Sequence, residues 1–152
     1  MNSKKTVLLL LLSINAFSFA QEKTYTIKDV EKIAIYPGCE ETLDNIEQTK
    51  CLNNKLMKDL YLQLSDSVKR MSDNNRFGNF RTFNTFTINS NGEFVDIVST
   101  GDRQLGDAVK NAFKKLNKLQ TKTNKKIIPA KNSYGENVNL QFSIPIHANI
   151  SI

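Results

Sequence analysis

A hairpin within residues 83–99 constrains the fold of this chain more than any other stretch. Its centre is Asn91-Gly92, a dipeptide that tolerates the positive φ angles of a tight turn. On the first arm Phe86 and Ile88 alternate with polar residues, so one face is apolar and the other is polar. On the second arm Ile97-Val98 breaks the alternation, which predicts a β-bulge. Because a lone hairpin is only marginally stable in water, other elements must cover its apolar face.

The chain has room for one domain, and its first twenty residues have the pattern of an export signal. Lys4-Lys5 form a basic start, residues 7–12 are apolar, and Ser18 and Ala20 are the small residues that signal peptidase requires. The apolar run is shorter than the roughly 20 residues of a membrane-spanning helix. We therefore predict a cleaved signal peptide over residues 1–20, with an uncleaved anchor as the alternative. No cysteine lies near the predicted cut, so nothing indicates a lipid-modified N-terminus.

The charge of the chain is mildly basic. The formal net charge of +6 loses two units with Lys4 and Lys5, which leaves +4 for the mature chain. This charge favours solubility and weak attraction to anionic surfaces, but it is proof of neither.

Two cysteines, Cys39 and Cys51, predict one disulfide in an exported chain. The loop that it closes has about a dozen residues, so the bond is worth roughly 3 kcal/mol in the chain-entropy model. The alternative places Cys51 at a helix N-terminus, where the dipole would lower the pKa of the thiol and make it reactive. No cysteine and histidine constellation supports this alternative.

The residues between the signal and Cys51 have a weak pattern. Residues 21–36 alternate irregularly, which fits either a short extended segment packed on the domain or a flexible leader. Tyr36-Pro37-Gly38-Cys39 is a turn, since proline fixes φ and glycine permits the reversal. We assign residues 21–50 to an N-terminal leader that contains this turn.

Two amphipathic helices flank the hairpin. From Cys51 the apolar residues recur at steps of three and four up to about Ser72, and they include Leu52, Leu56, Leu60, Leu64 and Val68, with Met57 and Tyr61 beside them. Asp102 is a suitable N-cap for the second helix. Its apolar face consists of Leu105, Ala108, Val109, Ala112, Phe113 and Leu116.

The last run of the chain alternates cleanly and predicts a strand of about ten residues. One face holds Val138, Leu140, Phe142, Ile144 and Ile146, and the other holds Asn139, Gln141, Ser143, Pro145 and His147. Pro145 lacks a backbone donor, so it belongs on an edge strand or at a strand end. An exposed edge is a site where a partner's strand can be added.

The order helix, hairpin, helix, strand resembles the C-terminal domain of TonB energy-transducing proteins. The resemblance covers residues 36–146 and rests on the hairpin, on Ile128-Pro129-Ala130-Lys131 with Tyr134-Gly135, and on the last strand. Pro37-Gly38-Cys39 and Cys51 resemble the variant that is common in Bacteroidetes-type envelopes.

The resemblance implies an α+β two-layer fold over residues 51–152, with two helices on a three-stranded antiparallel sheet. It also implies that the last strand binds an extended segment of an outer-membrane receptor, or of another envelope protein, by β-augmentation. The predicted edge residues are Asn139, Gln141, Ser143 and Pro145. The periplasm or cell envelope of a Gram-negative bacterium is the expected location.

Three features depart from the TonB pattern. We expect neither the N-terminal transmembrane helix nor the proline-rich spacer, because the signal looks cleavable and the chain has three prolines. The first strand has Thr82 and Asn84 where small β-branched residues are usual, and Phe83 is out of phase. This predicts a bulge or an altered face.

The sequence does not indicate an enzyme. No nucleophile has an evident base, no metal-ligand spacing or phosphate loop is present, and His147 is the only histidine. We therefore predict no catalytic residue, no metal and no cofactor; a hydrolase of unknown type is the weakest alternative.

A run of lysines follows Asp107 without an acid before Glu136. It is either an anion-binding patch for lipid or glycan, or the solvated face of a helix whose C-terminal dipole favours positive charge. Its principal members are Lys114, Lys115, Lys118, Lys122, Lys125 and Lys126. Nucleic acid is not an expected partner, because no aromatic residues interleave with the lysines.

Two functions remain open. The first is a non-catalytic envelope module that binds a protein segment along its last strand. The second is an envelope structural or adaptor protein that uses a basic surface to bind anionic glycan or lipid. Whether the domain forms a homodimer by strand exchange is left open as well.

Overall fold

The computed structural model describes residues 23–151 of the chain. The predicted signal peptide, residues 1–20, lies outside the described residues and stays a prediction. No helix within residues 23–151 combines the length and the apolar character that crossing a bilayer requires.

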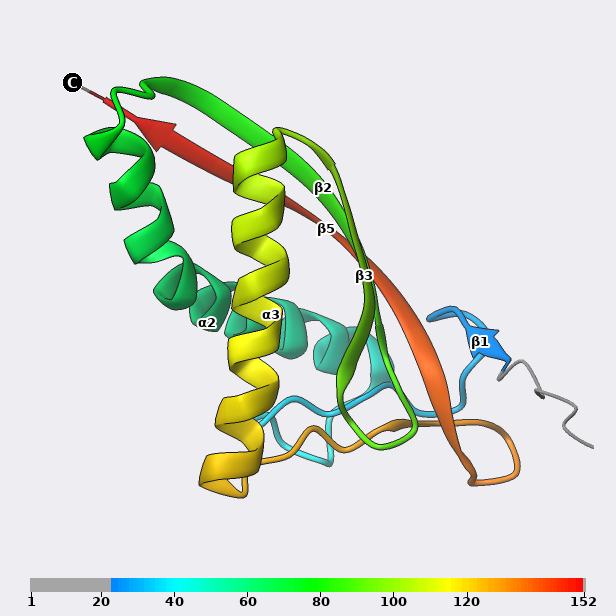
Figure 1. Ribbon diagram of the computed structural model, residues 1–152. Helices are drawn as coiled ribbons and strands as arrows, with labels where there is room; N and C mark the ends of the chain where they lie inside the picture. Colours follow the sequence, from blue (N-terminus) through cyan, green and yellow to red (C-terminus); the bar gives the residue numbers. More distant parts are fainter. Residues whose placement is uncertain (1–22, 152) are drawn as a thin grey trace, which may run out of the picture.

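Two helices cover one face of a curled sheet (Figure 1). This arrangement confirms the expected α+β class with two helices. In chain order the elements are β1 (Thr24–Tyr25), α2 (Asn45–Asp73), β2 (Gly78–Ile88), β3 (Phe94–Gly101), α3 (Arg103–Thr123), β4 (Ala130–Lys131) and β5 (Asn137–Ile150).

The sheet is mixed and has five strands. The expectation of a three-stranded antiparallel sheet is therefore wrong. Strands β5, β2 and β3 form the antiparallel part that was predicted. On the far side of β5, β1 adds in parallel, and β4 pairs antiparallel with the first two residues of β5. Both added strands have two residues, and a two-residue strand has no alternation from which it could be predicted.

The predicted hairpin is formed by β2 and β3. The N–H of Asn89 donates to the carbonyl of Glu93 at 2.9 Å, and the N–H of Gly92 donates to the carbonyl of Asn89 at 2.9 Å. Gly92 has a φ of +78°, whereas Asn91 is not in the left-handed region. The loop is therefore a turn followed by a left-handed glycine, which is wider than a two-residue hairpin loop.

The predicted bulge lies in β3. The register between β2 and β3 shifts from the pair Thr85–Val98 to the pair Thr87–Val95, so β3 has one extra residue there. Asp96 takes a φ of +51° at this point. The extra residue lets Phe94 and Ile97, three positions apart, both face the core, while Val98 faces outward.

The first helix begins before the predicted start at Cys51. Asp44 caps α2, since its side chain accepts from the N–H of Glu47 at 2.8 Å, and the helix runs from Asn45. The residues just before it also pack on the domain: Val30, Ile33 and Tyr36 are buried in the core. Of the two alternatives for this segment, the structure therefore shows the packed one.

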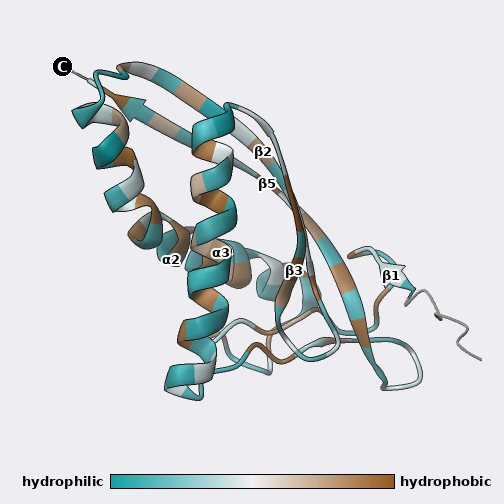
Figure 2. Cartoon of the chain, in the orientation of Figure 1, coloured by the Kyte–Doolittle hydropathy of each residue, from teal (hydrophilic) through white to brown (hydrophobic). Residues whose placement is uncertain are grey.

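The core lies between the helices and the sheet. Phe86 is at its centre and contacts Phe113 of α3 at a ring-centroid distance of 4.7 Å. It also contacts Phe142 at 5.6 Å and Phe94 at 5.7 Å. The alternating apolar and polar bands along β5 are visible in Figure 2. Every second residue of β5 thus faces this core, as predicted.

The first arm of the hairpin has an altered face and no bulge. The register between β2 and β5 is continuous from Gly78 to Ile88, and Thr82 and Asn84 are buried on the helix side. The side chain of Asn84 donates to Thr82 Oγ1 at 3.1 Å and accepts from Ser99 Oγ at 2.7 Å. These bonds satisfy the amide, so the polar residues are tolerated inside.

The second helix follows the prediction closely. Asp102 caps α3, and its side chain accepts from the N–H of Leu105 at 2.8 Å. That backbone bond and the nearby Arg76 guanidinium, 2.7 Å away, lower the pKa of the Asp102 carboxyl. Because the shift is downward, its contribution to stability is present above the ordinary pKa of aspartate and is lost as the pH falls through the lowered value.

Candidate functional site

The outer edge of β5 is the candidate site, and its backbone groups alternate in direction. The carbonyl of Ile144 accepts from the Asn84 side chain at 3.3 Å, so it faces β2. His147 is opposite Arg81, whose carbonyl accepts from the N–H of Asp102 at 2.9 Å on the β3 side. Arg81 and His147 therefore do not exchange hydrogen bonds, and both backbone groups of His147 face away from β2.

Pro145 fits the same alternation. Its partner Phe83 directs its carbonyl toward β3, where Thr100 Oγ1 donates to it at 3.3 Å. The missing N–H of Pro145 is thus one that would face away from β2, and no ladder bond is lost. The residues with outward-facing backbone groups are Gln141, Ser143, Pro145, His147 and Asn149.

Part of this edge is covered and part of it is open. Asn139 is paired with Thr24 of β1, so the structure does not place it on the open edge as predicted. β4 pairs with β5 only at Asn137 and Val138. Within the described part of the chain, no strand pairs with the outer edge beyond Leu140. Because Leu140 faces β2, its parallel partner Tyr25 bonds the residues on either side of it, so the N–H of Gln141 is also covered by β1. The open part of the edge therefore includes Ser143 and Pro145, and partner binding there stays a prediction.

The two sides of the open edge differ in chemistry. On the helix side Phe142, Ile144 and Ile146 are buried. On the other side the side chains of Gln141, Ser143, Pro145 and His147 are exposed. Phe83 and Val98 are also exposed on this open face, at 53% and 57%.

One residue of α2 reaches the open edge. The hydroxyl of Tyr61 donates to the carbonyl of His147 at 3.5 Å, which is long for a hydrogen bond. The Tyr61 side chain is 45% exposed. It therefore lies beside the edge rather than inside the core.

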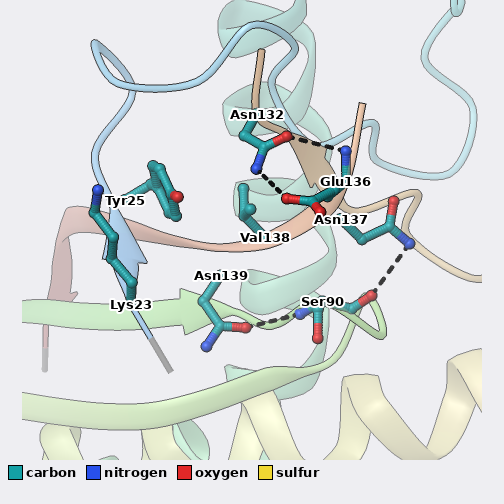
Figure 3. Close-up of a pocket in the computed structure, with 8 residues that line it drawn as sticks. All are labelled: Lys23, Tyr25, Ser90, Asn132, Glu136, Asn137, Val138 and Asn139. Carbon is teal, nitrogen blue, oxygen red and sulfur yellow. Dashed lines mark hydrogen bonds between the residues drawn. The ribbon is translucent and has the colours of Figure 1, made fainter. Parts of the chain in front are cut away.

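A cleft of about 230 Å³ lies where β1 meets the start of β5 (Figure 3). Its polar groups bind one another: the Asn132 side chain donates to Glu136 at 2.8 Å, and the Asn139 side chain accepts from the N–H of Ser90 at 2.9 Å. Asn137 donates to the Ser90 carbonyl at 3.5 Å. The two bonds to Ser90 join the turn after β2 to the start of β5, and the bond from Asn132 to Glu136 closes the turn before β5.

The two turns share a motif that the sequence shows and that our sequence analysis missed. Asn-Ser-x-Gly-Glu occurs at residues 89–93 and again at residues 132–136. In each turn the asparagine side chain accepts from two backbone N–H groups and donates to the glutamate. In each, the glycine has a φ of +78°.

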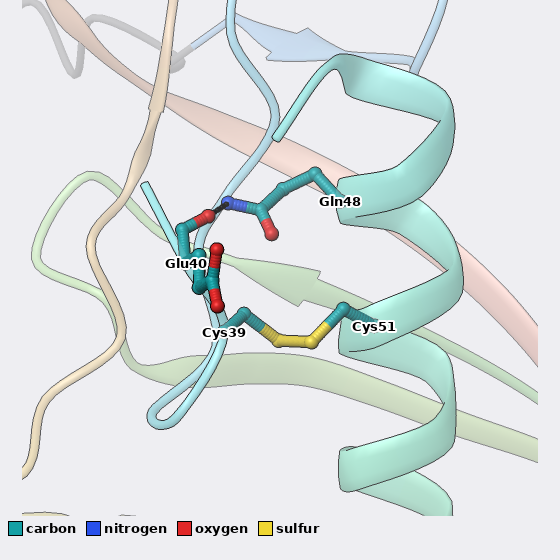
Figure 4. Close-up of a disulfide and its surroundings, with 4 residues drawn as sticks. All are labelled: Cys39, Glu40, Gln48 and Cys51. Atoms are coloured by element: carbon teal, nitrogen blue, oxygen red, sulfur yellow. Dashed lines mark hydrogen bonds between the residues drawn. A yellow bond between two sulfur atoms is a disulfide. The ribbon is translucent and has the colours of Figure 1, made fainter. Parts of the chain in front are cut away.

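The predicted disulfide joins Cys39 and Cys51, with an S–S distance of 2.05 Å (Figure 4). It ties the turn after Tyr36 to the first half of α2. Beside it the Gln48 side chain donates to the carbonyl of Glu40 at 3.2 Å. Both cysteines are used in this bond and no free thiol remains among the described residues, so the reactive-thiol alternative is wrong.

We expect removal of this disulfide to lower the free energy of unfolding by roughly 3 kcal/mol, because the unfolded chain regains loop entropy. The double variant Cys39→Ser, Cys51→Ser should show the loss in urea denaturation. The same variant should be insensitive to reductant, whereas the parent should lose stability when reductant is added. Equal stability of parent and variant would contradict the expectation.

The buried residue Tyr36 joins the leader to α2. The Tyr36 hydroxyl donates to Asp59 at 2.8 Å. Burial, and next the hydrogen bond to Asp59, raise the pKa of Tyr36 well above its ordinary value. The phenol therefore keeps its proton and acts as a structural donor.

The remaining sequence-predicted residues are spread over the surface. His147 is exposed on the open face of β5. Lys114, Lys115, Lys118, Lys122, Lys125 and Lys126 are all exposed on α3 and the loop after it. Within residues 23–151 the one salt bridge is Arg76–Asp102, and no cluster of three or more His, Cys, Asp or Glu side chains could hold a metal ion.

No protein-family model and no curated protein matches the sequence. Among solved structures, the C-terminal domain of TonB from Helicobacter pylori (residues 179–285, solution NMR) is similar at 18% identity and a TM-score of 0.39. The match covers 74% of this chain and 88% of that chain. A likeness of this size supports no conclusion about function.

Proposed function

We propose that this protein is a non-catalytic, protein-binding module of the cell envelope that captures an extended segment by strand addition along β5. The observation that carries the proposal is the row of outward-facing backbone groups from Ser143 to Asn149, with which no described strand pairs. An unpaired row of this kind is a template for another strand. The main-chain hydrogen bonds supply affinity whatever the sequence of the segment.

The partner that we propose is an extended segment of an outer-membrane receptor, which would link the module to TonB-dependent transport. The sequence resemblance to the C-terminal domain of TonB proteins supports this class of partner. The Cys39–Cys51 disulfide supports an oxidising compartment such as the periplasm.

The alternative is an envelope adaptor that binds anionic glycan or lipid through the lysines of α3. One observation favours it: these lysines are exposed, and none forms a salt bridge with another described residue. Strand capture is the stronger proposal. Exposed lysines are ordinary on a solvated helix face, whereas the outward backbone groups of β5 leave a strand edge open to pairing.

We expect Ser143→Pro to lower partner capture at least tenfold, since it removes an outward N–H from the uncovered part of the edge and places a ring there. The substitution removes no bond to β2, because the Ser143 N–H faces away from that strand. Capture is measured by pull-down from an outer-membrane extract, followed by cross-linking and mass spectrometry to locate the captured segment.

Ser143→Ala is the matched control, because it keeps the backbone N–H and should capture as the parent does. Circular dichroism and thermal unfolding must show that both variants are folded. Equal capture by Ser143→Pro and Ser143→Ala would count against strand addition. Retention of glycan or lipid by all three proteins would favour the alternative.

A further inference from the structure

One flank of α2 carries an apolar strip made of Met57, Tyr61 and Val68. These residues are four and seven positions apart, so they lie on one stripe of the helix. Met57 and Val68 are partly buried and pack against the core, whereas Tyr61 is 45% exposed. We call this set the α2 strip.

The α2 strip faces away from the other helix. The opposite flank of α2, with Asp59, Leu62 and Gln63, lines a groove together with residues of α3. The strip is therefore on the side of α2 that is remote from α3. The bond of 3.5 Å from Tyr61 to the His147 carbonyl places this side at the outer edge of β5.

A strand added to this edge would have two different faces. Its side chains alternate, so every second one lies on the helix side, next to Phe142, Ile144 and Ile146. Tyr61 lies on this side, beside His147. The side chains between them lie on the open face beside Gln141 and Ser143, which are exposed and polar.

We propose that the α2 strip, and Tyr61 above all, selects the sequence of the captured segment by contacting every second side chain. The segment that fits has apolar residues at alternate positions and polar residues between them. This inference rests on the proposed function. It adds selectivity for side chains to a binding mode whose affinity otherwise comes from main-chain hydrogen bonds. Tyr61 is suited to the role, because a tyrosine has a large contact area and few torsions to immobilise.

Two capped heptapeptides of identical composition test the rule. One alternates threonine and valine, and the other has its valines in one block, so it cannot direct all of them to the helix side. Each has two added glutamates for solubility. Titration of the ¹⁵N-labelled protein reports the dissociation constant, and shifts of the Ser143 and His147 amides report whether the edge is used.

We expect the alternating peptide to bind at least tenfold more tightly than the block peptide. Tyr61→Ala should abolish this preference, whereas Tyr61→Phe should keep it, because the ring rather than the hydroxyl makes the contact. Leu62→Ala is the matched control: Leu62 is the neighbouring exposed residue, at 61%, on the flank toward α3. It should leave both affinities unchanged.

The outcomes separate the two proposals. Equal binding of both peptides with shifts at the edge would overturn the role of Tyr61 and keep strand capture. Binding of neither peptide would overturn both, and so would self-association through β5, measured by ultracentrifugation, because the occupant would then be a second copy. Loss of the preference in Leu62→Ala as well as Tyr61→Ala would mean that α2 acts through its fold and would overturn the rule.

Discussion

Phe86→Ala is expected to lower the free energy of unfolding by about 3–5 kcal/mol, since it leaves a cavity at the centre of the core. Phe86 is 0% exposed and touches Phe94, Phe113 and Phe142. A domain of this size has a stability of roughly 5–15 kcal/mol, so one such substitution removes a large part of it. Urea denaturation monitored by circular dichroism measures the change.

Phe83→Ala is the matched control, because it changes the same residue type on the same strand. Phe83 is 53% exposed on the open face of the sheet, so we expect a loss of about 1 kcal/mol or less. If Phe86→Ala does not fold, Phe86→Leu should still show a smaller loss of about 1–2 kcal/mol. Similar losses for Phe83→Ala and Phe86→Ala would contradict the position of the core.

Gly92→Ala is expected to lower the free energy of unfolding by roughly 2–5 kcal/mol, which combines a left-handed backbone with a clash. A Cβ atom at Gly92 would lie 2.1 Å from the carbonyl oxygen of Ile127, and the φ of Gly92 is +78°. Neither partner in this contact can rotate away, because both are backbone. Thermal and urea unfolding of the variant measure the loss.

Gly135→Ala separates the cost of the left-handed backbone from the cost of the clash. Gly135 is in the second Asn-Ser-x-Gly-Glu turn and has the same φ of +78°, but a Cβ atom there meets nothing within 4 Å. We expect a loss of about 1–2 kcal/mol, from the left-handed conformation alone. The difference between the two variants is the cost of the clash at Ile127. Equal losses would mean that the hairpin turn moves freely away from residue 127.

Much of the fold could be predicted because its signals are local. The helices around Leu56 and Val109 follow from apolar spacing, and the cap at Asp102 follows from residue type. The bulge in β3 follows from the phase break between Phe94 and Ile97, since two residues three positions apart cannot both face one side of a regular strand.

The site was predictable only in part. Pro145 indicated an edge strand, and the structure leaves Ser143 and Pro145 uncovered on that edge. The pairing of Asn139 with Thr24 could not be predicted, because a contact between two such distant short segments has no periodicity. Tyr61 has helical spacing like a core residue, and only the packing of α2 decides that it remains half exposed beside β5.

Residue order alone therefore specified the hairpin, the helices, the disulfide partners and the alternation of the last strand. These depend on steric preferences and on hydrophobic periods that act within a few residues. The tertiary structure alone decided which part of the β5 edge is covered by β1 and which flank of α2 lies beside the rest. Both depend on contacts between segments far apart in the chain, where one residue's placement is set by the packing of all the others.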